Sequence, residues 1–204
     1  MAYSTADIRN IALVGQAGAG KTLLAESLLT ESGAIRSRGS LERGTTVCDF
    51  DPQEQELRHS LDAAMVHLDV GACRVNLIDT PGYPDFAGRA LSVLEAVETA
   101  AIVVSAVNGI EPVTQRMMEF ARDRELCRLI VINKIDSKDA RTEQVLADLR
   151  ETFGRECLPL NLPAERGTKS STVSSSPATR SPTSPRSRPR TPRSATRWSR
   201  STSN

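Results

Sequence analysis

The chain contains 204 residues, of which 39% are hydrophobic and 3% aromatic, enough for one compact domain with a hydrophobic core. Its formal net charge of +1 combines two unlike regions, because residues 168–204 hold eight basic side chains and no acidic one, whereas the rest of the chain is acidic. No apolar run approaches the roughly 20 residues that a membrane helix requires, and the first residues lack the basic and apolar parts of a secretion signal. The four cysteines form no C-x-x-C pair, which argues against a zinc site or a disulfide framework and favours the reducing cytoplasm.

Short apolar runs alternate with amphipathic segments along the first 160 residues. Four apolar runs predict strands, at residues 11–14, 75–78, 101–104 and 129–132. Apolar side chains at helical spacing predict helices, around residues 23–29, 86–97, 113–121 and 145–153. We expect a further, antiparallel strand within 61–69 and mostly loop within 33–60. This alternation predicts an α/β fold with a mostly parallel sheet and flanking helices.

Ser, Thr, Pro and Arg dominate the chain after residue 164. Such a composition cannot bury enough apolar surface to offset the entropy of ordering, which predicts a disordered tail over residues 164–204 after a domain over residues 1–163. Two interpretations of the tail stay open: a basic arm that contacts RNA without sequence specificity, and a frame-shifted translation of a GC-rich gene. We favour the frame shift, because the domain before the tail also ends unfinished.

Eight consecutive residues match the phosphate-binding pattern G-x-x-x-x-G-K-[ST]; they are Gly15, Gln16, Ala17, Gly18, Ala19, Gly20, Lys21 and Thr22. The motif lies between a predicted strand and a predicted helix, where its backbone N–H groups can surround phosphates at a helix N-terminus. Lys21 would reach the β- and γ-phosphates, and the Thr22 hydroxyl would coordinate Mg²⁺. The dinucleotide spacing G-x-G-x-x-G is not met, because Leu23 stands where its last glycine would be. The motif therefore predicts a P-loop NTPase.

Two further motifs follow predicted strands. Asp79 begins the sequence D-T-P-G and would face Mg²⁺ through a water molecule, while Gly82 would offer its N–H to a γ-phosphate. Asn133, Lys134 and Asp136 belong to the sequence N-K-x-D, in which one carboxylate can accept from the two adjacent donors on the guanine edge. Ligands of open α/β sheets bind at the carboxyl ends of the strands. The three motifs together predict a Mg²⁺-dependent domain that binds GTP and GDP.

With these motifs, residues 8–160 resemble the start of translational GTPases, closest to elongation factor G and its G-like relatives. The acidic stretch 51–56 and the sequence Gly-Ile-Glu-Pro at 109–112 are similar to that family as well. The resemblance implies a cytoplasmic, monomeric factor that docks on the ribosome and hydrolyses GTP, with Lys21 and Tyr83 as candidate catalytic residues. Ribosome-protection and release-type GTPases share these motifs and stay open as alternatives.

The chain departs from the family pattern at several positions. The family's first switch usually reads Arg-Gly-Ile-Thr, where this chain reads Leu-Arg-His-Ser at 57–60. Ser60 keeps the hydroxyl and is a candidate Mg²⁺ ligand, with an ordinary serine at the start of a strand as the alternative. We expect His59 to be a surface side chain rather than a base. Tyr83 stands where the family has a water-orienting histidine, and a phenol with a pKa of about 10 is a poor substitute for imidazole. Gly18 replaces the family's usual aspartate.

The family's last guanine-contacting motif, Ser-Ala-Lys or Ser-Ala-Phe after a final strand, is absent from this chain. We therefore predict an incomplete sheet with an unpaired edge and one open side of the base pocket. A non-hydrolysing switch and a non-functional fragment stay open as alternatives to an active GTPase.

Overall fold

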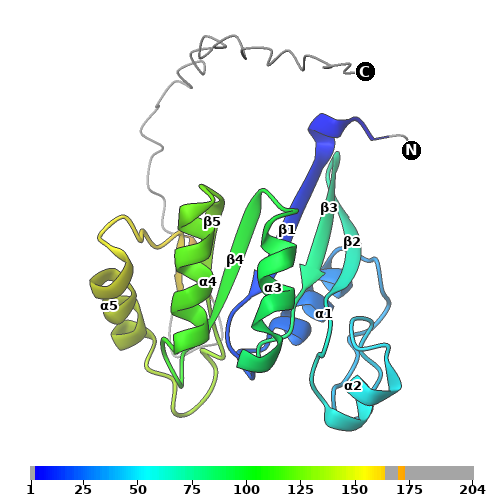
Figure 1. Ribbon diagram of the computed structural model, residues 1–204, viewed down its shortest axis with the longest axis horizontal. Coiled ribbons are helices and arrows are strands. Elements are labelled where there is room, and N and C mark those ends of the chain that lie inside the picture. Colours follow the sequence, from blue (N-terminus) through cyan, green and yellow to red (C-terminus); the bar gives the residue numbers. More distant parts are fainter. Residues whose placement is uncertain (1–2, 164–169, 173–204) are drawn as a thin grey trace, which may run out of the picture. The chain divides into compact units, whose positions relative to one another are not determined.

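Five strands form one mixed sheet in the computed structural model, which describes residues 3–163 and 170–172 (Figure 1). They are β1 (Ile8–Val14), β2 (Ala64–Val70), β3 (Cys73–Asp79), β4 (Thr99–Ser105) and β5 (Cys127–Asn133). Their order is β2-β3-β1-β4-β5, in which β2 is antiparallel to β3 and all other neighbours are parallel. The predicted α/β fold with a mostly parallel sheet is confirmed, and so is the antiparallel strand expected within 61–69.

Helices cover both faces of the sheet (Figure 1). On one face lies α1 (Lys21–Glu31), and the helices of the other face are α3 (Ala87–Leu94), α4 (Pro112–Asp123) and α5 (Thr142–Phe153). Two 3-10 turns, η1 (Thr5–Asp7) and η2 (Pro84–Phe86), precede β1 and α3. The four helices lie where the apolar spacing predicted them.

Alternating side chains of the central strands build a separate core on each face. Ala100, Ile102 and Val104 of β4 pack against α3, α4 and α5, while Ala101 and Val103 pack on the α1 side. The same alternation holds in β1, and all of these residues of β4 are buried. A strand that is buried on both faces shows an uninterrupted apolar run, which is why the sequence pattern located β4 well.

A short helix, α2 (Pro52–Leu57), lies within the segment that we expected to be loop. Asp51 caps it by accepting a hydrogen bond from the Gln53 backbone N–H at 2.8 Å, and Pro52 occupies the first turn. The helix ends at Arg58, whose φ of 58° is left-handed. Helical periodicity is hard to detect in so short a segment, and the capping residues alone marked it.

The carboxyl ends of β1, β3, β4 and β5 meet at one edge of the sheet, because these strands are parallel. This edge is at the bottom of Figure 1, where the loops that follow the strands lie. The opposite edge carries the far ends of α3 and α4, where Arg124 forms an ion pair with Glu95. All three sequence motifs therefore lie at the same end of the domain.

Among the described strands, β5 pairs only with β4, in keeping with the predicted unpaired edge. An apolar cavity of about 670 Å³ lies beside this strand, and α5 and residues 156–161 also line it. Its lining contains none of the residues predicted to bind nucleotide.

Two short strands, β6 (Asn161–Pro163) and β7 (Ser170–Thr172), pair antiparallel in a sheet of their own. The strand β7 was not expected, since it falls within the segment predicted as a tail. Residues 164–169 and 173–204 lie outside the described residues, so the disorder of that tail stays a prediction. The described range contains no helix that is long and apolar enough to cross a membrane. All four cysteines lie in that range and none forms a disulfide.

Candidate nucleotide-binding site

The loop 15–20 connects β1 to α1 and is bent by three glycines with left-handed backbones, namely Gly15, Gly18 and Gly20. A side chain at Gly15 would place its Cβ 2.4 Å from the backbone oxygen of Val103. Helix α1 begins directly at Lys21, whose Nζ donates to the backbone oxygens of Gly15 and Gln16, both at 2.9 Å. The loop therefore encloses an ammonium group at a helix N-terminus, an arrangement that favours anions.

The Gln16 side chain turns away from this loop and is buried beside α4. Its Nε2 donates to Glu111 Oε1 at 2.9 Å and to the Gly109 backbone oxygen at 3.3 Å, and its Oε1 accepts from the Thr114 hydroxyl. Gln16 is therefore available to a ligand only through its backbone. The side chain connects the loop to the start of α4, a contact that sequence reasoning did not anticipate because its partners are more than 90 residues away.

A chain of oxygen atoms extends from the start of α1 to the loop before α2. The Thr22 hydroxyl donates to Asp79 Oδ2 at 2.6 Å and lies 3.4 Å from the Ser60 hydroxyl. Ser60 in turn donates to Asp49 Oδ1 at 2.8 Å, and Thr46 donates to the other oxygen of Asp49 at 3.0 Å. The structure thus brings the predicted residues Thr22, Ser60 and Asp79 together and adds Asp49, which is buried.

Asp49 was missed because no spacing rule reaches into the loop 33–60. Its position depends on the path of that loop, which two other buried carboxylates hold. Glu26 of α1 accepts from the backbone N–H groups of Gly39 at 2.7 Å and Val47 at 2.5 Å. A buried acid in the middle of a predicted amphipathic helix is the one sequence signal that could have pointed to this anchor.

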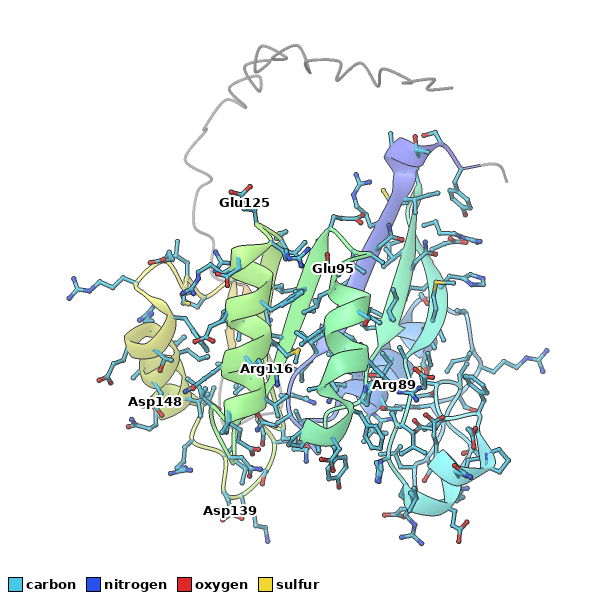
Figure 2. The ribbon with its side chains drawn as sticks, in the orientation of Figure 1. Arg89, Glu95, Arg116, Glu125, Asp139 and Asp148 are labelled. Atoms are coloured by element: carbon cyan, nitrogen blue, oxygen red, sulfur yellow. The ribbon has the colours of Figure 1, made fainter. Side chains whose placement is uncertain are left out.

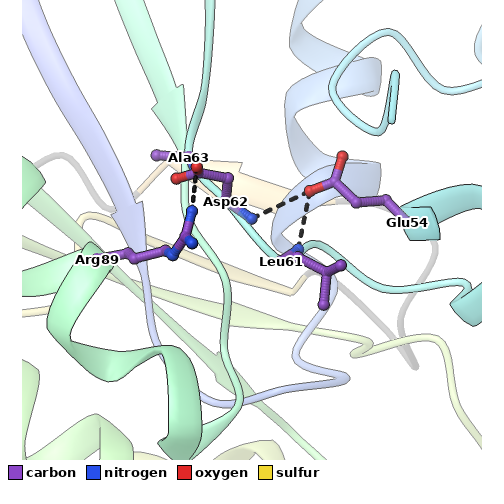
Figure 3. Close-up of polar contacts among 5 residues, drawn as sticks. All are labelled: Glu54, Leu61, Asp62, Ala63 and Arg89. Carbon is purple, nitrogen blue, oxygen red and sulfur yellow. Dashed lines mark hydrogen bonds and ion pairs between the residues drawn. The ribbon is translucent and has the colours of Figure 1, made fainter. Parts of the chain in front are cut away.

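Glu54 of α2 holds the end of the same loop (Figure 3). Its Oε1 accepts from the backbone N–H groups of Leu61 at 2.8 Å and Asp62 at 3.1 Å. The Asp62 carboxylate forms an ion pair with Arg89 of α3, and both side chains are exposed, so the pair contributes little stability. The buried Glu54 therefore holds the backbone just after Ser60, whose own hydroxyl donates to Asp49.

Burial and charge shift two titrating groups of the site. Burial lowers the pKa of Lys21 to about 8, an effect that the nearby Asp79 carboxylate partly offsets. Burial raises the pKa of Asp79 to about 6, against the Thr22 hydrogen bond and the Lys21 charge, which lower it. Asp79 Oδ1 is the one buried side-chain oxygen or nitrogen without a hydrogen-bond partner in the described part of the chain. The site thus holds a buried carboxylate oxygen that a cation or a water molecule would satisfy.

The possible metal ligands near Asp79 are the hydroxyl and carboxylate oxygens of Thr22, Ser60 and Asp49. The described residues contain no group of three or more His, Cys, Asp or Glu side chains arranged for a metal. A site that has few protein oxygens fits Mg²⁺, which usually keeps several waters and binds substrate phosphates. It does not fit Zn²⁺, which takes nitrogen and sulfur ligands in closed sites.

Gly82 brings the segment after β3 against the phosphate loop. A Cβ at this position would lie 2.4 Å from Lys21 Nζ and 2.5 Å from the Ala17 backbone nitrogen. Only glycine allows so close an approach of the two backbones. The next residue, Tyr83, packs its ring on His59, with the ring centroids 4.5 Å apart and an interplanar angle of 50°. His59 is therefore half-buried, which corrects our expectation of a surface side chain.

The loop after β5 carries the predicted base-recognition residues. Asn133 Nδ2 donates to the Ala19 backbone oxygen at 2.9 Å, and a Cβ at Gly20 would lie 2.5 Å from the same nitrogen. Lys134 has a left-handed backbone with φ of 59°. Both Lys134 and Asp136 are exposed. Asp139, which Figure 2 labels at the lower end of the molecule, belongs to the same loop. The structure thus brings the base motif next to the phosphate loop, with Asn133 as the connection.

A phosphate loop at a helix N-terminus, after β1 and with an acid at the end of the neighbouring β3, defines a P-loop nucleotide-binding domain. The family described as "Elongation factor Tu GTP binding domain" matches residues 6–196, and the chain belongs to this family. The predicted resemblance to translational GTPases is thereby confirmed.

Relatives of the chain carry names from translation and from antibiotic resistance. The chain is 38% identical over 160 residues to the "Elongation factor G-like protein" of Mycobacterium tuberculosis, a match over 78% of this chain and 22% of that protein. It is 35% identical over 168 residues to the "Tetracycline resistance protein TetM" of Streptomyces lividans, over 82% of this chain and 26% of that one. A crystal structure of a Thermus thermophilus protein aligns with a TM-score of 0.75 and 41% identity, over 81% of this chain and 25% of that chain. The chain thus spans about a quarter of the length of these relatives.

Proposed function

We propose that the chain binds GTP and GDP together with Mg²⁺ at the carboxyl edge of its sheet, as the nucleotide-binding part of a translational GTPase of the elongation-factor-G type. The observation that carries this proposal is the meeting of two motifs at one edge. Lys21 and the Thr22–Asp79 pair lie beside the phosphate loop, and Asn133 connects that loop to the base motif at 2.9 Å.

In this proposal the loop 15–20 surrounds the phosphates with its backbone N–H groups, and Lys21 exchanges its two carbonyl partners for phosphate oxygens. Thr22 and Ser60 hold Mg²⁺ with their hydroxyl groups, and Asp79 holds it through a water molecule. When it is bound, Mg²⁺ neutralises charge on the β- and γ-phosphates. Gly82 then lies beside the γ-phosphate, because its backbone is already against Lys21 and Ala17.

Base selectivity in this proposal depends on Asp136. Its carboxylate offers two acceptors to the N1–H and the 2-amino group of guanine, whereas adenine lacks the matching pair of donors. Asn133 fixes the start of the loop, and the stem of Lys134 lies along the base. Neither Lys134 nor Asp136 is buried, which leaves both side chains accessible to a nucleotide.

Nucleotide titrations of the purified 204-residue chain test this proposal. Affinities for GTP, GDP and ATP are measured by calorimetry, with Mg²⁺ and with a chelator in its place. We expect GTP and GDP to bind roughly 100-fold more tightly than ATP, as the loss of a bidentate charged contact implies, and GTP to bind more weakly without Mg²⁺. Equal affinity for GTP and ATP would refute the base assignment, and the absence of any nucleotide binding would refute the proposal.

The ribosome is the proposed partner, by similarity to relatives named as elongation-factor-G-like and tetracycline-resistance proteins. The proposal includes a monomer in the cytoplasm and a non-specific RNA contact by the eight basic side chains of residues 168–204. We expect the chain to co-sediment with ribosomes in the presence of GTP. Its RNA binding should weaken steeply with added salt and disappear when residues 168–204 are removed. RNA binding that survives this deletion would exclude the tail as the contact.

A further inference from the structure

We propose that His59, held by its contact with Tyr83, positions the water molecule that attacks the γ-phosphate of bound GTP. This inference rests on the proposed function and adds to it a residue that lies outside the three nucleotide-binding motifs. It assigns GTP hydrolysis to an imidazole from the loop before β2, with the Tyr83 ring as its support.

The two segments that carry these rings both contact residues of the P-loop motif. His59 is followed directly by Ser60, whose hydroxyl is 3.4 Å from Thr22 Oγ1 and donates to the buried Asp49 at 2.8 Å. Tyr83 follows Gly82, whose backbone lies against Lys21 Nζ and the Ala17 nitrogen. Both rings are thus one residue away from groups that contact the P-loop residues, at the end where the γ-phosphate would lie.

The ring of His59 is fixed by packing. It lies 4.5 Å from the Tyr83 ring and 6.4 Å from the Phe86 ring, centroid to centroid, and the residue is half-buried. Its Nδ1 is 3.4 Å from the backbone oxygen of Ser60, and no hydrogen bond to the described residues uses its Nε2. One nitrogen of a restrained imidazole therefore remains available for a water molecule. Tyr83 itself is 42% exposed, so solvent reaches this pair of rings.

The choice between the two rings follows from their chemistry. A neutral imidazole has one nitrogen that accepts a hydrogen bond and one that donates, so its Nε2 can hold a water molecule in a fixed direction. The Tyr83 hydroxyl is at the end of a longer side chain that is more exposed, so it is a less restrained partner for a water molecule. The chain has two histidines, and His67 lies on β2, away from this loop. His59 is therefore the imidazole that lies at this site.

The reaction is the transfer of the γ-phosphoryl group to water. The water oxygen forms a bond to the γ-phosphorus while the bond between that phosphorus and the β–γ bridging oxygen breaks, and GDP leaves with the electron pair. The products are GDP and inorganic phosphate, and the protons of the water end on phosphate and in the solvent. His59 contributes a hydrogen bond that holds the water in line.

Four variants separate a hydrogen-bonding role from a packing role. His59→Phe keeps a ring against Tyr83 but removes both nitrogens, whereas His59→Gln loses the ring and keeps a hydrogen-bonding amide. Tyr83→Phe keeps the ring contact and removes the hydroxyl. His67→Phe makes the same change at the histidine of β2 and serves as the matched control.

Single-turnover hydrolysis of saturating Mg²⁺·GTP is measured for the full chain and each variant, together with the GTP dissociation constant and the melting temperature. We expect His59→Phe to lower the rate roughly 100-fold, as the loss of a group that positions a reactant implies, with the dissociation constant nearly unchanged. His59→Gln should retain more of the rate than His59→Phe. Tyr83→Phe, which keeps the ring against His59, should lose less of the rate than His59→Phe, and the control His67→Phe should remain close to the wild-type rate.

Two results would overturn the inference while the proposed function stands: a His59→Phe rate equal to that of the wild type, or a wild-type chain that binds GTP selectively and does not hydrolyse it. A lower rate in both His59→Phe and His59→Gln with an equal loss of GTP affinity would assign His59 to packing alone. If His59→Phe does not fold, His59→Gln is compared with the wild type alone. A rate that falls more than the GTP affinity supports the proposed role, and an equal fall of both assigns His59 to packing. Failure of the wild type to bind GTP would overturn the proposed function as well.

Discussion

The proposed site has a phosphate end, around the loop 15–20 and Asp79, and a base end, on the loop after β5, and the two are built in different ways. At the phosphate end, Lys21, Asp79 and Asp49 are buried, and each makes hydrogen bonds within the protein. At the base end, Asp136 is not buried, and Asn133 is the residue that contacts the phosphate loop. The fold thus organises the proposed phosphate site before a ligand arrives, whereas the proposed base selectivity depends on a few accessible side chains.

The largest expected effect comes from Lys21→Ala at the phosphate end. The ammonium is the buried cation that would face the β- and γ-phosphates, and its loss removes charged hydrogen bonds of about 3 kcal/mol in total. We expect GTP affinity to fall roughly 100-fold or more in calorimetric titrations. Lys138→Ala, on the loop after β5, is the matched control. Unchanged GTP affinity in Lys21→Ala would contradict the phosphate-loop assignment.

Asp136→Asn tests the base end and should have the next largest effect. The amide keeps one acceptor and presents a donor to the guanine 2-amino group, so GTP affinity should fall about 30-fold. A xanthine nucleotide, which has an oxygen in place of that amino group, should bind the variant better than GTP does. Asp139→Asn on the same loop should leave both affinities unchanged (Figure 2). Intact guanine selectivity in Asp136→Asn would show that another residue recognises the base.

Gln16→Leu tests whether the contacts of the Gln16 side chain with α4 stabilise the domain and the phosphate end. The substitution leaves the Thr114 hydroxyl and the Gly109 carbonyl without their buried partner, so the free energy of unfolding should fall by about 1.5 kcal/mol. Because the Gln16 backbone oxygen accepts from Lys21, GTP affinity should fall too. Urea unfolding measures the first effect, with the exposed Gln115→Leu of α4 as control. Equal stability of the two variants would mean that the contact to α4 is dispensable.

Asp79→Asn is the variant for which we expect a gain, and this gain is in the stability of the nucleotide-free chain. Asp79 has a pKa of about 6 in the folded chain against a usual 3.8, so the folded state holds the proton more tightly. The stability that this proton contributes is present below about pH 4 and is lost as the pH rises through 6. At pH 7 the nucleotide-free variant should therefore be more stable than the wild type, by no more than about 3 kcal/mol, because each pKa unit corresponds to about 1.4 kcal/mol.

This stability difference should shrink when the pH falls toward 4, and thermal melts at several pH values measure it. Asp123→Asn, at an exposed position on α4, should show no such dependence on pH. The same Asp79→Asn variant should lose Mg²⁺-dependent GTP binding. A variant that is less stable than the wild type at pH 7 would show that the Asp79 charge is better compensated than its burial indicates.

Sequence reasoning located the motifs because strand ends are easy to predict. The apolar runs of β1, β3 and β5 fixed the places of Lys21, Asp79 and Asp136, and parallel pairing then brought them to one edge. Asp49 and His59 could not be placed in this way. Both belong to the segment 33–60, whose path depends on backbone N–H groups bound by Glu26 and Glu54, and such contacts leave no period in the sequence. The side chain of Gln16 was missed for a related reason, since its partners belong to a distant helix and the turn before it.

The β2–β3 hairpin connects the two segments that flank the proposed γ-phosphate position. It begins a few residues after Ser60 and ends at Asp79, and the two strands stay in register from Ala64 opposite Asp79 to Val70 opposite Cys73. A shift in the register of either strand would break this ladder, so we expect the two segments to stay coupled through it. If loss of the γ-phosphate displaces one segment, we therefore expect the other segment to be displaced too. Amide exchange in the two segments should then rise together.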